Sequence, residues 1–312
     1  MDPLSHVLSL LNVDEAVSAP LLAGGDWAVD FPGHPHIKFA AVVEGSGVLT
    51  VSGAPEPVQV KEGDCFLVVG RLPYRLASGP HVPAVPAHTV YRHVVDGFAR
   101  VGGPPDTTFV GGSFTFDPAT APLLLDVLPP MVHVPSGSEH AEALRATLAL
   151  VAHEVRATRL GAPLMLDRLA HVVLLHALRA HAAAEAARPA PGGGWLVAAL
   201  DPQIGPALRA LHGDPARAWT VAELAALARM SRSTFALRFK AAVGASPLDH
   251  LLRLRMHAAA AALRDTDRTV AAVAAAVGYG SESAFGAAFK RVMGTPPGDY
   301  RTALSSAHAL RR

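Results

Sequence analysis

The sequence of 312 residues predicts an α+β protein of two domains, an N-terminal β-barrel followed by helices and a C-terminal domain made only of helices. Two observations support this division: the apolar period changes near Glu139, and a Pro/Gly-rich segment follows Ala187. A third is a repeat of about fifty residues in the last part of the sequence. The expected boundaries are 1–187 for the first domain (barrel about 1–135, helices about 139–187), 188–194 for a linker, 195–303 for the second domain and 304–312 for a tail.

Short apolar or alternating runs, separated by turn residues such as Gly45-Ser46-Gly47, predict the strands of the barrel. These runs are Ile37–Val43, Gly47–Val51, Val58–Val60, Cys65–Val69 and Thr89–Val95.

Two amphipathic helices are predicted after the barrel, with a break at Gly161-Ala162-Pro163. Their apolar positions are Leu144, Leu148, Val151 and Val155 in the first helix and Leu166, Leu169, Val173 and Ala177 in the second. In one interpretation, these stripes only close the open end of the barrel. In the other, which we favour, they also pair with a second copy of the chain, and a homodimer is expected.

Charge is distributed unequally along the chain. Residues before Gly194 include 12 basic and 18 acidic side chains, whereas the remainder includes 15 basic and 8 acidic ones. A basic second half favours a polyanionic partner, although a basic surface can also be simply solvated. The single cysteine, Cys65, excludes a disulfide framework, and no long uncharged apolar run or basic N-terminal leader is present, so a cytoplasmic protein is expected.

The repeat lies in the second domain. Phe235, Phe239, Lys240, Gly244, Pro247 and Asp249 recur as Phe285, Phe289, Lys290, Gly294, Pro297 and Asp299. Each unit is predicted to be a helix, a tight turn and a second helix that begins after Ser231 or Ser281, whose hydroxyl can cap it. Because the two phenylalanines of a unit lie four residues apart, they share one face and pack inward, which leaves the opposite face free to enter a major groove.

A linker helix is predicted between the two units, starting at Ser246-Pro247 and running to about Arg264. Its inner stripe is expected to contain Leu248, Leu251, Leu252, Met256, Ala259 and Leu263. At 1.5 Å per residue the helix is about 27 Å long, which can place two DNA-reading helices roughly one turn of DNA (about 34 Å) apart. An ordinary helical bundle with a duplicated hairpin is the alternative.

Several further segments of the second domain are distinctive: Trp219-Thr220-Val221-Ala222-Glu223-Leu224-Ala225, Ser231-Arg232-Ser233, Leu254-Arg255-Met256 and Val277-Gly278-Tyr279. In these segments the domain resembles the AraC/XylS family of transcription activators. The first half, with Phe114-Thr115-Phe116-Asp117 and Leu128-Pro129-Pro130-Met131-Val132-His133, resembles the cupin-type regulatory domain of some members.

This resemblance implies a cytoplasmic, often dimeric regulator that binds promoter DNA in a sequence-specific manner, acts on RNA polymerase and is modulated by a small-molecule effector in its first domain. Family members often carry arginine midway between the paired hydrophobic positions of each reading helix. This chain has Leu237 and Ala287 at those positions, which puts the family's base contacts there in doubt.

Candidate DNA-binding residues follow from the outer faces of the two reading helices. In the first helix they are Ser231 at its start, Arg232, Ser233, Thr234 and Ala236 toward the bases, and Arg238 and Lys240 toward phosphate. In the second they are Ser281, Glu282, Ser283 and Gly286, with Lys290 and Arg291 toward phosphate. Arg232 can contact guanine through two hydrogen bonds or bind only phosphate, and Glu282 either accepts from cytosine or, as we favour, interacts with the start of its helix.

The effector pocket of the first domain is expected to be lined by His36, Lys38, Tyr74 and Arg75, although each could also be an ordinary surface residue. His34-Pro35-His36 is similar to the His-x-His pair of metal-binding cupins. However, Glu44 lies too far along the sequence, and Tyr74 takes the approximate place of the last histidine ligand. We therefore expect no metal, no other cofactor and no catalytic residue.

Two other classes of function remain as alternatives. The first is a metal-dependent cupin enzyme, an oxygenase or isomerase, fused to a helical module. The second is a scaffold that uses its helical half for protein contacts, and salt-dependent duplex binding would exclude it.

Overall fold

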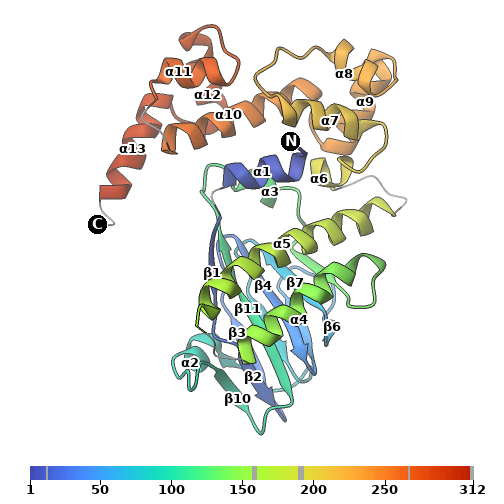
Figure 1. The fold of residues 1–312 in the computed structure, drawn as a ribbon, viewed down its shortest axis with the longest axis vertical. Coiled ribbons are helices and arrows are strands. Elements are labelled where there is room, and N and C mark those ends of the chain that lie inside the picture. Colours follow the sequence, from blue (N-terminus) through green and yellow to red (C-terminus); the bar gives the residue numbers. More distant parts are fainter. Residues whose placement is uncertain (12, 157–159, 189–192, 266–267, 310–312) are drawn as a thin grey trace. The chain divides into compact units, whose positions relative to one another are not determined.

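The computed structural model describes residues 1–312 except 12, 157–159, 189–192, 266–267 and 310–312, so most of the expected linker lies outside the described residues. The chain forms two compact units (Figure 1). The β-rich unit contains residues 13–115 and 128–184, and the helical unit contains residues 1–12, 116–127 and 185–312.

The β-rich unit contains two sheets. The larger has the strand order β10-β2-β11-β4-β7-β12, with β1 also pairing β11. Its strands are β1 (Asp14–Val17), β2 (Leu21–Gly24), β4 (Ile37–Glu44), β7 (Cys65–Val69), β10 (Ala99–Gly102), β11 (Thr107–Thr115) and β12 (Met131–Val134). The smaller has the order β6-β5-β8-β3-β9 and consists of β3 (Ala28–Phe31), β5 (Ser46–Val51), β6 (Val58–Lys61), β8 (Tyr74–Ala77) and β9 (Val85–Pro86).

The expected cupin-like β-structure is therefore present, but the two sheets formed by the described strands do not join into a closed barrel. Four of the five predicted strands coincide with β4, β5, β6 and β7. The prediction of a strand over Thr89–Val95 is wrong, because this region begins within helix α2 (Ala87–Tyr91), which follows Pro86 and buries Ala87 and Val90 three residues apart.

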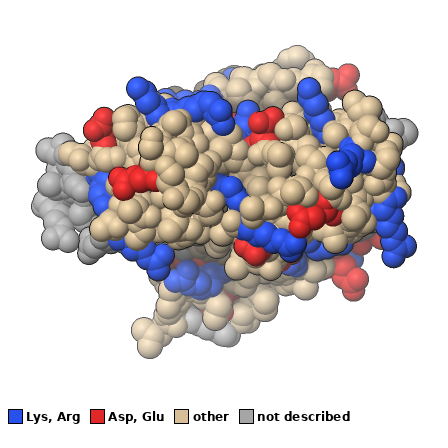
Figure 2. Space-filling model, turned by 90° about the horizontal axis from the view of Figure 1, so that it is seen from above, with Lys and Arg blue, Asp and Glu red and all other residues tan. Residues whose placement is uncertain are grey.

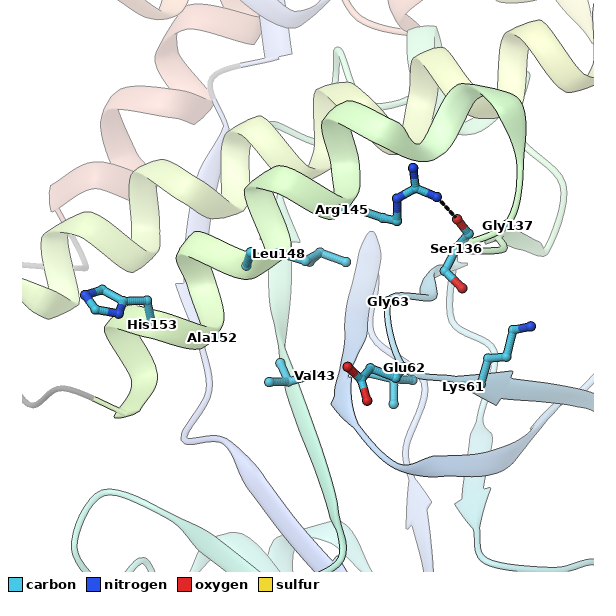
Figure 3. A pocket seen from close by; sticks show the side chains of 12 residues that line it. Val43, Lys61, Glu62, Gly63, Ser136, Gly137, Arg145, Leu148, Ala152 and His153 are labelled. Carbon is cyan, nitrogen blue, oxygen red and sulfur yellow. Dashed lines mark hydrogen bonds between the residues drawn. The ribbon is translucent and has the colours of Figure 1, made fainter.

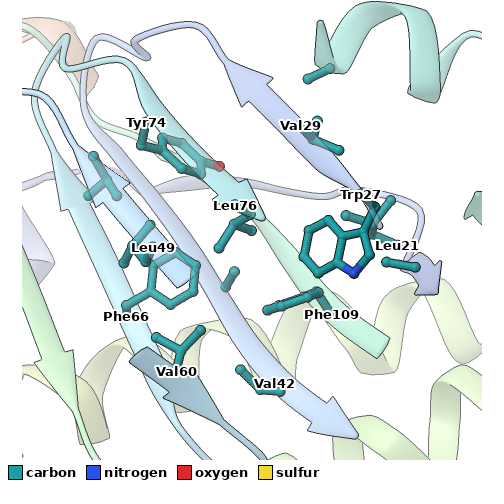
Figure 4. Packing of buried hydrophobic residues seen from close by; sticks show 14 of the residues in the cluster. Leu21, Trp27, Val29, Val42, Leu49, Val60, Phe66, Tyr74, Leu76 and Phe109 are labelled. Atoms are coloured by element: carbon teal, nitrogen blue, oxygen red, sulfur yellow. The ribbon is translucent and has the colours of Figure 1, made fainter. Parts of the chain in front are cut away.

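The core of this unit contains residues from both sheets (Figure 4). Along β4, the side chains of Ala40 and Val42 enter this core together with Leu49 of β5 and Leu76 of β8. Because successive strand residues point to opposite faces, Lys38 shares the face of Ala40 and Val42 and points toward the same interior.

Two helices confirm the helical prediction for the region after the strands: α4 (Glu142–Arg156), which follows the 3₁₀ turn Glu139–Ala141, and α5 (Ala162–Ala186). They cross the outer face of the larger sheet (Figure 1). Leu148 of α4 and Val173 of α5 approach Phe39 and Ala41, which point to this side of β4. The predicted apolar stripes therefore pack against the sheet.

The helical unit consists mainly of the predicted C-terminal helices. These are α6 (Gly194–Ala198), α7 (Ile204–Gly213), α8 (Val221–Leu227), α9 (Arg232–Val243), α10 (Pro247–Asp265), α11 (Val270–Ala276), α12 (Glu282–Met293) and α13 (Pro297–Ala309). Among the described helices, none is both long and apolar enough to cross a bilayer.

Two segments that lie far earlier in the sequence also belong to this unit: α1 (Pro3–Leu11) and residues 116–127, which include α3 (Pro122–Leu125). Asp117 forms an ion pair with Arg264 of α10 at 3.0 Å, and both side chains are largely buried. The indole Nε1 of Trp195 donates to the carbonyl of Leu123 at 2.7 Å. The chain therefore enters and leaves the helical unit more than once.

Candidate nucleic-acid interface and effector cavity

The first helix-turn-helix unit is formed by α8 and α9. Thr220 and Glu223 make a reciprocal capping box at the start of α8, in which the Glu223 amide donates to Thr220 Oγ1 at 3.2 Å and the Thr220 amide donates to Glu223 Oε2 at 2.8 Å. The turn contains Arg229 at φ 54°, and Ser231 then caps α9 by accepting from the amide of Thr234 at 3.3 Å. These local interactions fix where the first reading helix begins.

The inner face of α9 contains Phe235 and Phe239, which are fully buried with ring centroids 5.5 Å apart. Helix α9 ends at Gly244, whose φ of 85° lies in the left-handed region that glycine adopts without strain. The opposite face remains exposed to solvent, as the repeat predicts.

The second unit repeats this construction with α11 and α12. Thr269 caps α11, and Ser281 caps α12 by accepting from the amide of Ala284 at 3.4 Å. Phe285 and Phe289 are fully buried with centroids 5.5 Å apart, and Gly294 ends the helix at φ 80°. The two units thus share caps, core aromatics and terminal glycines.

Helix α10 joins the two units and has 19 residues, which corresponds to a length of about 28 Å. Leu251, Met256, Ala259 and Leu263 are buried as predicted. The prediction for Leu248 is wrong because its side chain is 45% exposed, and Leu254 is buried instead. The boundaries and most of the inner face agree with a linker between two reading helices.

The outer face of α9 contains most of the predicted contact residues. Arg232, Ser233, Thr234 and Lys240 are exposed, Ala236 is half-buried, and the hydroxyl of Ser231 is used as the cap. Leu237, which lies at the centre of this face, is 74% exposed.

Arg238 is held within the unit. Its guanidinium lies 3.2 Å from Asp201 Oδ2 and donates to the side chain of Gln203. Burial raises the pKa of the Asp201 carboxyl, but the amides of Ile204 and Gln203 and the charge of Arg238 outweigh it and hold that pKa below its usual value. This geometry favours a structural role for Arg238 in the unbound protein.

On α12, Ser281 is the cap, and Glu282, Ser283 and Lys290 are exposed. Glu282 lies in the first turn, where a carboxylate interacts favourably with the helix dipole. Gly286 is half-buried, and a Cβ atom placed there would have no neighbour within 4 Å. This helix therefore presents small side chains between its acidic start and its basic end.

A cleft of about 740 Å³ lies within the helical unit between the C-terminal ends of α9 and α12. Lys240 and Arg291, which were predicted to bind phosphate, line it together with Arg253 of α10. Figure 2 shows Lys and Arg side chains spread over the visible face, with acidic side chains between them. The distribution fits contacts at several separate phosphates more closely than one compact basic patch.

The β-rich unit contains a cavity of about 380 Å³ between its two sheets. Aromatic side chains of Phe31, Tyr74, Tyr91 and Phe109 line it, and the rings of Phe31 and Tyr74 stack with centroids 4.6 Å apart (Figure 4 labels Tyr74 and Phe109). A volume and lining of this kind suit a small, largely apolar ligand.

The structure brings two of the four predicted pocket residues, Lys38 and Tyr74, to this cavity. Arg75 instead forms an ion pair with Asp30 at 2.7 Å, and His36 is buried outside the cavity lining. His34 lines the cavity although it was not predicted to do so. His34 and His36 precede β4, so strand alternation does not indicate which of the two side chains points into the cavity.

Lys38 is an unusual residue for such a cavity. Burial lowers the pKa of its ammonium group, and burial together with the charge of Lys38 lowers the pKa of His34. Among the side chains that the structure describes, no carboxylate lies within 4.0 Å of the Lys38 ammonium. The inward direction of Lys38, one of the predicted pocket residues, also follows from strand alternation in β4, where Lys38 shares the face of Ala40 and Val42.

A second, more open groove of about 960 Å³ lies between α4 and the β6–β7 turn (Figure 3). Arg145 donates to the backbone carbonyl of Ser136, and Lys61, Glu62 and His153 also line the groove. The groove combines charges of both signs with apolar residues such as Val43 and Leu148, so its lining does not define one class of ligand.

His34 and His36 lie with ring centroids 6.4 Å apart. Within the described part of the chain, no group of three or more His, Cys, Asp or Glu side chains is arranged to hold a metal ion.

Two reading helices, capped alike and joined by one helix, define the class of protein as a helix-turn-helix DNA-binding protein with an additional β-rich domain. A cupin family model matches residues 2–183, and a helix-turn-helix domain model matches residues 224–303. A putative AraC-like transcription regulator from Streptomyces lividans is 46% identical over 301 residues, which cover 96% of this chain and 98% of that protein.

The chain therefore belongs to the AraC-like transcription regulators and is a DNA-binding transcription regulator with a cupin domain before its helix-turn-helix domain. The regulator AlkR of Acinetobacter baylyi is 35% identical over 180 residues, covering 57% of this chain and 58% of that protein. The solved DNA-binding domain of AdpA, in complex with a target DNA, is 33% identical, covers 34% of this chain and 95% of that domain, and gives a TM-score of 0.32.

Proposed function

We propose that this regulator responds to a small effector with an apolar body and one anionic group, which binds in the cavity between the two sheets. The observation that carries the proposal is the inward-pointing Lys38 ammonium in an aromatic cavity, with no described carboxylate at ion-pair distance. Lys38 is half-buried, and a partly desolvated charge without an ionic partner is costly. A carboxylate on the ligand would reduce that cost through a charge-assisted hydrogen bond.

Calorimetric titration of the full-length protein with decanoate and with decanol tests this chemistry. A hydrogen bond between charged groups contributes about 1.5–3 kcal/mol, so decanoate binds about tenfold or more tightly than decanol. Lys38→Met removes this preference, whereas Lys61→Met, a change at an exposed lysine of β6, retains it. Failure to bind either probe, or equal affinity for both, contradicts the proposal.

We further propose that residues 195–303 act as the DNA-binding domain and that the predicted residues of α9 and α12 contact DNA. The support is the exposure of Arg232, Ser233 and Lys240 on the face opposite the buried phenylalanines. Arg232→Ala is expected to relax base preference at one position and to cost about 1–3 kcal/mol. A binding-site selection that shows unchanged preference for this variant would reject the assignment of Arg232 to a base contact.

A homodimer through α5 is a separate proposal. Leu164, Met165 and Val172 of α5 are 61%, 50% and 36% exposed. Met165 and Val172 lie seven residues apart and therefore on the same line of the helix. The proposed partner is the same face of a second copy. Light scattering is expected to show that the Val172→Glu variant is a monomer. The control variant Val85→Glu, which changes an exposed valine of β9, is expected to remain a dimer. A wild-type monomer at micromolar concentration contradicts the proposal.

Cytoplasmic location and contact with RNA polymerase are proposed on family membership alone. Transcription in vitro with purified polymerase tests the contact, using a template that carries a selected binding site. We expect the amount of transcript to change when the protein is added. An unchanged amount at saturating protein contradicts a direct effect on polymerase.

A further inference from the structure

Leu237 occupies the most outward line of the first reading helix. Successive residues of a helix are rotated by about 100°, so Leu237 is rotated by about 200° from Phe235 and by about 200° from Phe239. It therefore lies almost opposite both buried phenylalanines. Its neighbours on the same face, three and four residues away, are Ser233, Thr234, Lys240 and Ala241, and all of them are exposed. With 74% of its side chain exposed, Leu237 is an apolar contact point between a polar start and a basic end of the helix.

A single exposed leucine on an ordinary surface needs no explanation. This one lies at the centre of the face that a helix-turn-helix protein places in the major groove. The side chain of leucine can neither donate nor accept a hydrogen bond, whereas the major-groove edge of a G·C pair presents the polar groups N7, O6 and N4 and no methyl group. The thymine 5-methyl group is the apolar surface that the major groove offers, and contact with it distinguishes T·A from other pairs.

We infer that Leu237 makes the first reading helix select thymine by packing against its 5-methyl group. This inference rests on the proposed DNA-binding role of α9 and goes beyond it, since it names the base that is read. A G·C pair at this position is disfavoured because its polar groups lose water against leucine without gaining a partner.

The corresponding position of the second reading helix is Ala287, and its neighbour Gly286 has open space around it. A shorter apolar side chain reaches less far from the helix axis, so its contact with a methyl group is smaller. The two halves of the binding site are therefore read unequally, with the stronger thymine requirement in the half-site bound by α9.

The test begins by selecting duplexes from a random pool with the full-length protein. In the selected duplex, each thymine is then replaced in turn by deoxyuridine, which removes only the 5-methyl group. Burial of one such group contributes about 0.8 kcal/mol, so we expect about a fourfold loss of affinity at one thymine in the half-site of α9.

Three variants complete the experiment. Leu237→Ala should lose the deoxyuridine effect at that position, and Leu237→Arg should change the selected base to guanine. Leu200→Ala, a control at another exposed leucine of the same unit, should keep the fourfold effect. Thermal melts of each variant confirm that the helical unit is folded.

The inference is overturned if no thymine shows a methyl effect in the wild-type protein, or if the effect persists in Leu237→Ala. Absence of salt-dependent binding to any duplex is a different result, because it contradicts the DNA-binding function itself. Binding with an unchanged selection in Leu237→Arg also overturns the inference while leaving DNA binding intact.

Discussion

Lowering the pH is expected to destabilise the helical unit because its core contains neutral histidines. His212 Nε2 and His250 Nε2 lie 3.0 Å apart, so one nitrogen donates a hydrogen and the other accepts it. Burial, together with the neighbouring His250, lowers the pKa of His212 from the usual 6.5 to about 2. Burial, together with the charge of Arg253, lowers the pKa of His250 from 6.5 to about 4. His6 of α1 packs edge-on against His212, and burial lowers its pKa as well.

The direction in which stability changes with pH follows from the number of protons that the histidines bind in the folded and in the unfolded state. Below pH 6.5 the unfolded chain binds protons on these histidines, whereas His212 and His250 stay neutral in the folded unit down to about pH 4. Stability is therefore complete above pH 6.5 and falls as the pH drops toward 4. Each such histidine contributes up to about 1.4 kcal/mol per pH unit, so the pair removes about 2–3 kcal/mol per unit.

Urea titrations at about pH 7.5, 6 and 5 measure this loss, with a stability of 5–15 kcal/mol typical of a domain. Trp195, whose ring lies 5.7 Å from that of His212, reports on the unit by fluorescence in a Trp27→Phe, Trp219→Phe background. His250→Gln, which keeps a hydrogen-bonding side chain, should lower the pH slope by the share of one histidine, up to about 1.4 kcal/mol per pH unit, while His6, His212 and His257 still contribute. The control His153→Gln in the other unit should leave the slope unchanged. A stability of the helical unit that is independent of pH between 6.5 and 5 would refute the reasoning.

Three further predictions concern individual contacts. Asp117→Asn removes the carboxylate that pairs with the largely buried Arg264 at 3.0 Å and should cost about 2–3 kcal/mol of stability in the helical unit, measured by urea titration; no loss would contradict a contribution of this pair. Thr220→Ala removes one half of the capping box and should cost about 1 kcal/mol in the same measurement, whereas an unchanged midpoint would show that the cap contributes nothing. Lys240→Ala should weaken binding to all duplexes alike and reduce the salt slope by about 1, and a base-specific effect would contradict phosphate contact.

The second domain could be predicted closely because its signals are local. Ser231 and Ser281 mark where the reading helices begin, and Gly244 and Gly294 mark where they end. Phe235 and Phe239 lie one helical turn apart, so their common burial follows from spacing alone. Interactions within a few residues decide all of these features.

The first domain was predicted less completely because its features depend on contacts between distant segments. Val94 and Val95 continue an apolar run, yet both are exposed, and the helix that ends at Tyr91 is set by packing of Val90 against the core. Likewise, nothing near Arg75 in the sequence shows that Asp30, 45 residues away, holds its guanidinium outside the cavity lining.

The packing of residues 116–127 in the helical unit has the same cause. Asp117 lies in a segment that resembles a cupin domain, and its partner Arg264 lies 147 positions later in the linker helix. A pattern within one segment cannot reveal such a pair. For the same reason, the sequence did not reveal the ion pair between Arg238 and Asp201, which lie 37 positions apart.

The central claim is that two reading helices on one linker helix bind successive major-groove segments of the same duplex. Selection of duplexes from a random pool, followed by hydroxyl-radical footprinting of the bound protein, tests it most directly. The account predicts two contacted segments about 10 base pairs apart on one side of the duplex, with an affinity that falls steeply with salt. A single contacted segment, or contacts on opposite sides of the duplex, would contradict it.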